Sequence, residues 1–145
     1  MSTVIAEPMP STPLMLSTRL VYQLGEPHSG LRATTSRTGP AVVITAGGDI
    51  DACNEDTWRQ LVGEAAAVVV PPGPFIVDVT GLDFMGCCAF AVLADAARHC
   101  RDRGVDLRLV SHEAIVARIV DACGLNRVLP IYPTVDSALG AVSPW

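Results

Sequence analysis

The sequence lacks a long uninterrupted apolar run. The apolar run at residues 65–70 ends at Pro71-Pro72, far short of the about 18 residues that a membrane-spanning helix requires. Residues 1–16 also lack the positively charged start and the continuous apolar centre of a secretory signal peptide. We therefore expect a cytoplasmic protein without a membrane-spanning segment.

Positive charge is also scarce. Lys and Arg together number 10 against 15 Asp and Glu, which gives a formal net charge of −5 and a pI near 5.0. Proteins that bind nucleic acids or anionic membranes place many basic side chains against phosphate groups. The charge balance therefore argues against a nucleic-acid partner and against a membrane-surface partner.

Motifs of metal sites and of enzymes are missing as well. The five cysteines include no Cys-x-x-Cys pair, and the three histidines lie far from any pair of cysteines in the sequence. The sequence contains no phosphate-binding loop, nucleophile elbow or metal triad. It therefore predicts no metal, no cofactor and no catalytic residue. The odd number of cysteines in a cytoplasmic chain indicates reduced thiols.

What the sequence does contain is an alternation of strands and helices after residue 30. This alternation favours an α/β fold with a central mixed β-sheet and four or five helices packed on it. A length of 145 residues fits one domain, which we place at residues 31–145. Residues 1–30, rich in Pro, Ser and Thr, predict a flexible N-terminal extension with one short ordered piece around residues 20–24. The predicted strands are residues 41–46, 75–79, 106–110 and 128–132, and the predicted helices are residues 54–67, 87–103, 112–123 and 134–142.

The most informative stretch is residues 75–103. A buried strand ends at Val79, and a short connection through Met85 leads to a long helix whose first turn covers residues 86–89. Free backbone N–H groups and the helix dipole favour a negative group at a helix N-terminus. We therefore expect this turn to be central to the function.

The same stretch resembles the signature of the STAS domain family, which includes bacterial anti-sigma factor antagonists and the tails of sulphate transporters. Residues 48–51, Gly-Asp-Ile-Asp, resemble a second motif of the family, and residues 124–139 resemble its closing segment. The resemblance covers about residues 31–142 and implies one STAS-like domain. The positions that match the signature are Asp78, Val79, Thr80, Leu82, Phe84 and Met85.

The resemblance implies a regulatory binding module that is not an enzyme. Such a module antagonises an anti-sigma factor of the serine-kinase type and so controls sigma-factor-dependent transcription. Where the family carries Asp-Ser-Ser/Thr-Gly, this chain has Gly-Cys-Cys-Ala, and the family's phosphorylatable serine falls on Cys87. A cysteine does not accept phosphate from a serine kinase, so the family's usual switch is in doubt here. The oligomeric state stays open between a monomer and a weak dimer.

The expected partner-binding residues lie around this turn and in the acidic motif. Phe90 and Ala91 fall on a second apolar stripe of helix 87–103, which predicts an exposed docking patch; the alternative is that Phe90 packs under a neighbouring loop or the N-terminal extension. Asp49 and Asp51 predict an acidic rim for basic partner residues; the alternative is that Asp51 only caps or polarises the next helix. The full expected set is Asp49, Asp51, Cys87, Cys88, Phe90 and Ala91.

Cys87 itself admits more than one interpretation. We favour cysteine as a small replacement for serine that leaves a protein which always binds its partner. The alternative is a thiol-based redox regulator, because a helix N-terminus lowers the pKa of a thiol and oxidation would add negative charge at the phosphosite position. A small-molecule or nucleotide-sensing module ranks last, because the sequence offers no phosphate cradle.

Overall fold

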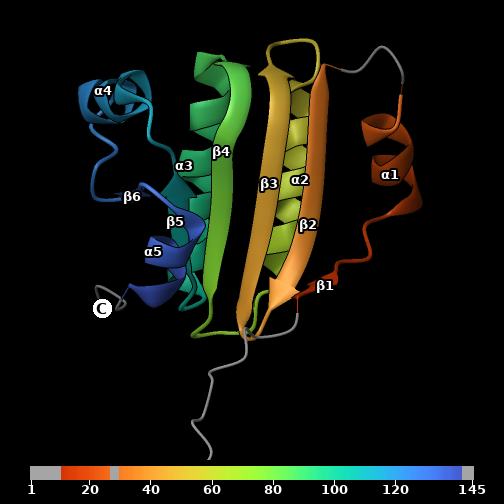
Figure 1. The fold of residues 1–145 in the computed structure, drawn as a ribbon, viewed down its shortest axis with the longest axis horizontal. Helices are drawn as coiled ribbons and strands as arrows, with labels where there is room; N and C mark the ends of the chain where they lie inside the picture. Colours follow the sequence, from red (N-terminus) through yellow and green to blue (C-terminus); the bar gives the residue numbers. More distant parts are fainter. Residues whose placement is uncertain (1–10, 27–29, 142–145) are drawn as a thin grey trace, which may run out of the picture.

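Six strands form a mixed sheet at the centre of this computed structural model, which describes residues 11–26 and 30–141. The strands are β1 (Ser11–Pro13), β2 (Leu31–Thr38), β3 (Ala41–Ile50), β4 (Pro74–Met85), β5 (Asp106–Val110) and β6 (Ile131–Tyr132). They lie in the order β1-β2-β3-β4-β5-β6 (Figure 1). The first three pair antiparallel and β3 to β6 pair parallel, which confirms the predicted mixed sheet.

In the part of the chain that the structure describes, five helices accompany the sheet. They are α1 (Thr18–Leu24), α2 (Glu55–Ala67), α3 (Cys87–Asp102), α4 (Ala114–Ala122) and α5 (Val135–Gly140). In Figure 1, α2 and α3 lie behind the sheet, α5 lies in front of it, and α1 lies beyond β2. The helices therefore cover the two faces unequally.

The core follows the alternation of side chains along each strand. Val42, Ile44 and Ala46 of β3 are buried in the main core cluster, which also includes Trp58 of α2. The intervening Val43 belongs to a smaller cluster with residues of β4, β5 and α5. Successive side chains of a strand point to opposite faces, so β3 supplies apolar groups to both layers.

Two central strands are longer than the sequence predicted. β3 runs through Ile50 and β4 through Met85, so the expected connection at residues 82–85 is part of the sheet. Glycines permit this continuation: Gly48 has φ +87°, and a Cβ at Gly81 would lie only 2.9 Å from the Ala46 carbonyl oxygen. The pairing of the two strands is irregular at this point, yet it continues to their ends.

Other element ends also differ from the prediction. β6 contains only residues 131–132 of the predicted 128–132, and α4 begins at Ala114 rather than at residue 112. The Ser111 hydroxyl accepts a hydrogen bond from the Glu113 amide, so Ser111 turns the chain before α4, whose N-cap is Glu113. Thr134 caps α5 in a reciprocal pair with Ser137.

The prediction of a flexible extension at residues 1–30 is wrong for residues 11–13 and 18–19, which lie in β1 and in the start of α1. β1 pairs with β2, and α1 packs on the domain through Leu20, which has no exposed surface. The predicted ordered piece around residues 20–24 corresponds to α1. One leucine and a few polar contacts leave no strong sequence pattern, which explains the wrong prediction. Residues 1–10 and 27–29 lie outside the described residues.

Candidate partner-binding site

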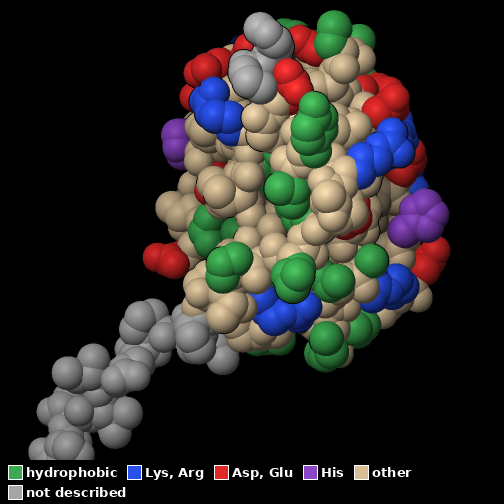
Figure 2. Space-filling model, turned by 90° about the vertical axis from the view of Figure 1, so that its right-hand side faces the viewer, with side chains coloured by type: hydrophobic (Ala, Val, Ile, Leu, Met, Phe, Trp, Pro, Cys, Tyr) green, Lys and Arg blue, Asp and Glu red, His purple; other side chains and the backbone are tan. Residues whose placement is uncertain are grey.

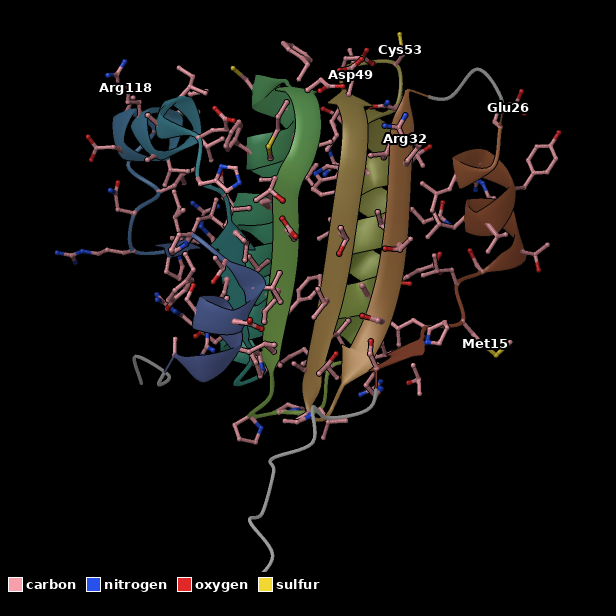
Figure 3. All side chains as sticks on the ribbon, viewed as in Figure 1. Met15, Glu26, Arg32, Asp49, Cys53 and Arg118 are labelled. Atoms are coloured by element: carbon pink, nitrogen blue, oxygen red, sulfur yellow. The ribbon has the colours of Figure 1, made fainter. Side chains whose placement is uncertain are left out.

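The predicted site residues gather at the carboxyl edge of the parallel strands. Asp49 lies at the end of β3, Asp51 follows that strand, and Cys87 begins α3 directly after β4. Figure 3 shows Asp49 and Cys53 at the upper end of the sheet, close to the end of β4. Figure 2 shows acidic side chains gathered at the same end. The parallel pairing of β3 and β4 places both motifs at one edge.

The acidic segment is held in place by Asn54. Its side-chain oxygen accepts from the Asp51 amide at 3.0 Å, and its side-chain nitrogen donates to the Asp49 carbonyl oxygen at 2.9 Å. The Asp51 carboxylate accepts from the Cys53 amide at 2.9 Å, as in an Asx turn. Asn54 occupies the N-cap position of α2, but its side chain makes no capping hydrogen bond and stabilises this loop instead. Both aspartates are half-buried.

The start of α3 is anchored to its neighbours by two hydrogen bonds. The Gly86 amide donates to the Ile50 carbonyl oxygen at 2.8 Å, which ties the turn to β3. The indole N–H of the fully buried Trp58 donates to the Ala89 carbonyl oxygen at 3.3 Å, which ties it to α2. No side chain caps this helix. The first turn of α3 therefore has a fixed position relative to the acidic segment.

The two adjacent cysteines of this turn differ in environment. Cys87 is exposed, whereas Cys88 is half-buried. Burial raises the pKa of the Cys88 thiol, and the hydrogen bond to the negatively charged Glu55 raises it further. Cys88 therefore favours its neutral form, and Cys87 is the more exposed thiol of this turn.

All five cysteines are free thiols. Cys100 is buried in the core, and burial raises its pKa to about 11, which fits an inert structural thiol. Cys53 and Cys123 are exposed.

The prediction that Phe90 forms an exposed docking patch is wrong. Phe90 is only 2% exposed and belongs to the main core cluster, although Ala91 beside it is exposed. The extended end of β4 and helix α4 lie beside Phe90 and line the same hollow. Phe90 is therefore buried, as in the alternative, but the elements beside it are strand β4 and helix α4, where a loop or the N-terminal extension was expected. The periodicity of α3 does not reveal the elements that lie over it.

The sequence analysis missed two exposed apolar residues at this edge. Phe84 is 55% exposed and Ile115 is 56% exposed. Phe84 was used only as a match to a motif in a short connection, but it lies in β4, directly opposite Asp49 in the register of β3 and β4. The sequence signal for it was a large apolar side chain within the short connection after Gly81.

The described residues contain neither a candidate metal-binding cluster nor a helix that could span a membrane. Within residues 11–26 and 30–141, no group of three or more His, Cys, Asp or Glu side chains is placed to hold a metal ion. The helices of the described part of the chain are too short or too polar to cross a membrane.

Comparisons with known proteins agree with this architecture. The sequence profile described as "STAS domain" matches residues 32–138. A Mycobacterium tuberculosis protein named "Putative anti-anti-sigma factor Rv2638" is 68% identical over 140 residues, which cover 97% of this chain and 94% of that protein. "Anti-sigma-F factor antagonist RsfA" from the same species is 56% identical over 113 residues, which cover 78% of this chain and 88% of that protein. The crystal structure of an anti-sigma factor antagonist from Mycobacterium paratuberculosis superposes with a TM-score of 0.69 at 25% identity, covering 82% of this chain and 98% of the other.

Proposed function

Because this chain belongs to the STAS domain family, we propose that it is a regulatory binding module that antagonises an anti-sigma factor. Both Mycobacterium tuberculosis relatives support the proposal, since their names describe such antagonists and they match 97% and 78% of this chain. By occupying the anti-sigma factor, the chain would free a sigma factor and so control transcription.

The observation that carries the proposal is the exposed Cys87 at the start of α3, at the same edge as Asp49 and Asp51. An anchored turn beside a pinned acidic loop is a preorganised surface, which lowers the entropic cost of binding. We propose that the partner contacts Asp49, Asp51, Cys87, Cys88 and Ala91. The buried Phe90 would support this surface from below.

We further propose that Cys87 stands where relatives of this family carry a phosphorylatable serine, and that the partner is an anti-sigma factor of the serine-kinase type. A thiol at this position is not a substrate for a serine kinase, so the chain would bind without being switched off by phosphate. The exposure of Cys87 supports this assignment, since a kinase must reach the corresponding side chain.

The test is the affinity of the purified, reduced full chain for each kinase-type anti-sigma factor of the same cell, measured by biolayer interferometry. We expect tight binding to at least one of them. Cys87→Asp, which places a charge inside the contact, should weaken binding about 10-fold or more. Cys123→Asp, a matched change of an exposed cysteine beyond the far end of α4, should bind like the wild type. Failure of the wild type to bind any of these proteins would overturn the proposal.

A second experiment tests the role of Cys87. We expect Cys87→Ser, but not the wild type, to gain phosphate from the kinase and ATP, as seen by intact-protein mass spectrometry. Peroxide treatment should leave the affinity of the wild type unchanged. A loss of binding on oxidation that Cys87→Ala prevents would point instead to a redox switch.

A further inference from the structure

A groove of about 440 Å³ opens beside the first turn of α3, between the end of β4 and α4. Leu82, Phe84 and Met85 line it from β4, Phe90 lines it from α3, and Ile115 and Ile119 line it from α4. We call this hollow the β4–α4 groove. Figure 1 shows α4 at the same upper end of the molecule as the start of α3.

Two side chains of this groove are much more exposed than apolar residues of a core. Phe84 and Ile115 are 55% and 56% exposed, and both appear among the few large apolar side chains that are exposed in the described residues. They come from segments far apart in the sequence, yet they line the same groove. Exposed apolar side chains that gather around one hollow mark an interaction site, whereas scattered ones need no explanation.

The charged residues of the groove have one sign. Asp83 and Glu113 are exposed and line it together with the apolar side chains, and no Arg or His is among the residues that line it. Arg118 of α4 points outward, away from β4 (Figure 3). An apolar hollow with acidic groups beside it complements a bulky apolar side chain that has a basic neighbour.

The groove is continuous with the proposed partner surface. Phe84 lies opposite Asp49 in the register of the paired strands β3 and β4, and Met85 precedes the turn that carries Cys87. A partner that covers Cys87 would therefore reach the groove without a gap. Small-ligand sites bury most of the ligand surface in a concave pocket, whereas Phe84 and Ile115 project into solvent. This shape favours a protein as the occupant.

We propose that the β4–α4 groove is an anchor site for the anti-sigma factor, which inserts one bulky apolar side chain next to a Lys or Arg that pairs with Asp83 or Glu113. The identity of this partner rests on the proposed function. The groove adds the chemistry of the contact to that function. Phe84 and Ile115 hold the apolar side chain of the partner, and the carboxylates of Asp83 and Glu113 select its basic neighbour.

The first experiment needs no identified partner. The ¹⁵N-labelled full chain is titrated with N-acetyl-Leu-Arg-amide at millimolar concentration and followed by NMR. We expect saturable shifts of the signals of Phe84, Ile115 and Ile119, and weaker shifts with N-acetyl-Leu-Glu-amide. Equal shifts with both probes would reveal a general apolar site without charge selection, and no shift at these residues with either probe would count equally against the anchor. Either result overturns the proposal.

The second experiment uses the anti-sigma factor that the wild type binds. Phe84→Ala and Ile115→Ala should each weaken binding about 10-fold or more, as expected of central interface residues. Val21→Ala on α1 is the matched control, since Val21 is 56% exposed like Ile115, and it should bind within about two-fold of the wild type. Unchanged affinity of both groove variants beside a wild type that binds would refute the anchor and leave the proposed function standing. If the wild type binds no anti-sigma factor, the proposed function fails. The dipeptide titration alone then tests whether the groove binds an apolar side chain next to a basic one.

Discussion

Trp58→Phe tests how the structure positions the start of α3. Trp58 has no exposed surface, and its indole N–H donates to the Ala89 carbonyl oxygen in the first turn of that helix. Phenylalanine removes this hydrogen bond, a loss of about 1 kcal/mol. It also leaves part of the indole volume empty, which costs about 1–2 kcal/mol more. The free energy of unfolding should therefore fall by about 2–3 kcal/mol.

Urea denaturation followed by circular dichroism measures this change directly. For a chain of this size the corresponding decrease in Tm is about 8 °C. Val70→Ala is the control, because Val70 is 61% exposed and its truncation should change stability by no more than about 0.5 kcal/mol. A loss below about 1 kcal/mol for Trp58→Phe would refute the reasoning, since it would mean that neither the hydrogen bond nor the packing holds α3 in place.

Three further predictions concern charge and hydrogen bonding. Burial alone would raise the pKa of Glu64, but hydrogen bonds from the Ser17 amide, the Ser17 hydroxyl and Gln60 lower it below 4.5 overall. These bonds therefore stabilise the fold above pH 4.5, and their contribution is lost as the pH falls through the folded-state pKa of Glu64. In this pH range the free energy of unfolding should fall more steeply for the wild type than for Glu64→Gln. Urea denaturation at each pH measures this difference. Glu55→Gln should lower the pKa of Cys88, because it removes the negative charge that helps to raise it, and the rate of thiol alkylation against pH measures the change. Arg108→Met leaves a buried carboxylate without its partner at 2.8 Å and should cost about 3–5 kcal/mol of stability by urea denaturation. A loss of stability below about 1 kcal/mol would contradict an Arg108–Asp106 ion pair that is shielded from water.

Much of the fold was predictable from local patterns. The strand at residues 106–110 has the predicted bounds, and α3 differs from its predicted range by one residue. Both have strong signals: an alternation of charged and apolar residues in one case, and helical periodicity closed by Gly104 with φ +78° in the other. The family motifs named Asp49 and Cys87 as candidate site residues, and the structure places both at one edge of the sheet.

The failures share a physical cause, which is that they depend on contacts between distant segments. Gly81 is typical of the end of a strand, but in the sheet it allows close approach of β3 and β4. The apolar stripe with Phe90 indicated exposure, but α4, which follows more than twenty residues later, lies beside it. For the same reason, the exposed Phe84 emerged only once β4 was seen to continue.

The central claim is that the carboxyl edge of β3 and β4 is the surface that meets an anti-sigma factor. Hydrogen–deuterium exchange of the full chain, free and bound to the anti-sigma factor with the highest affinity, tests it most directly. The account predicts slower exchange in the complex at residues 49–54 and 82–91, with no change at α5. Protection confined to α5 or to the β1–β2 edge, with unchanged exchange around Cys87, would contradict it.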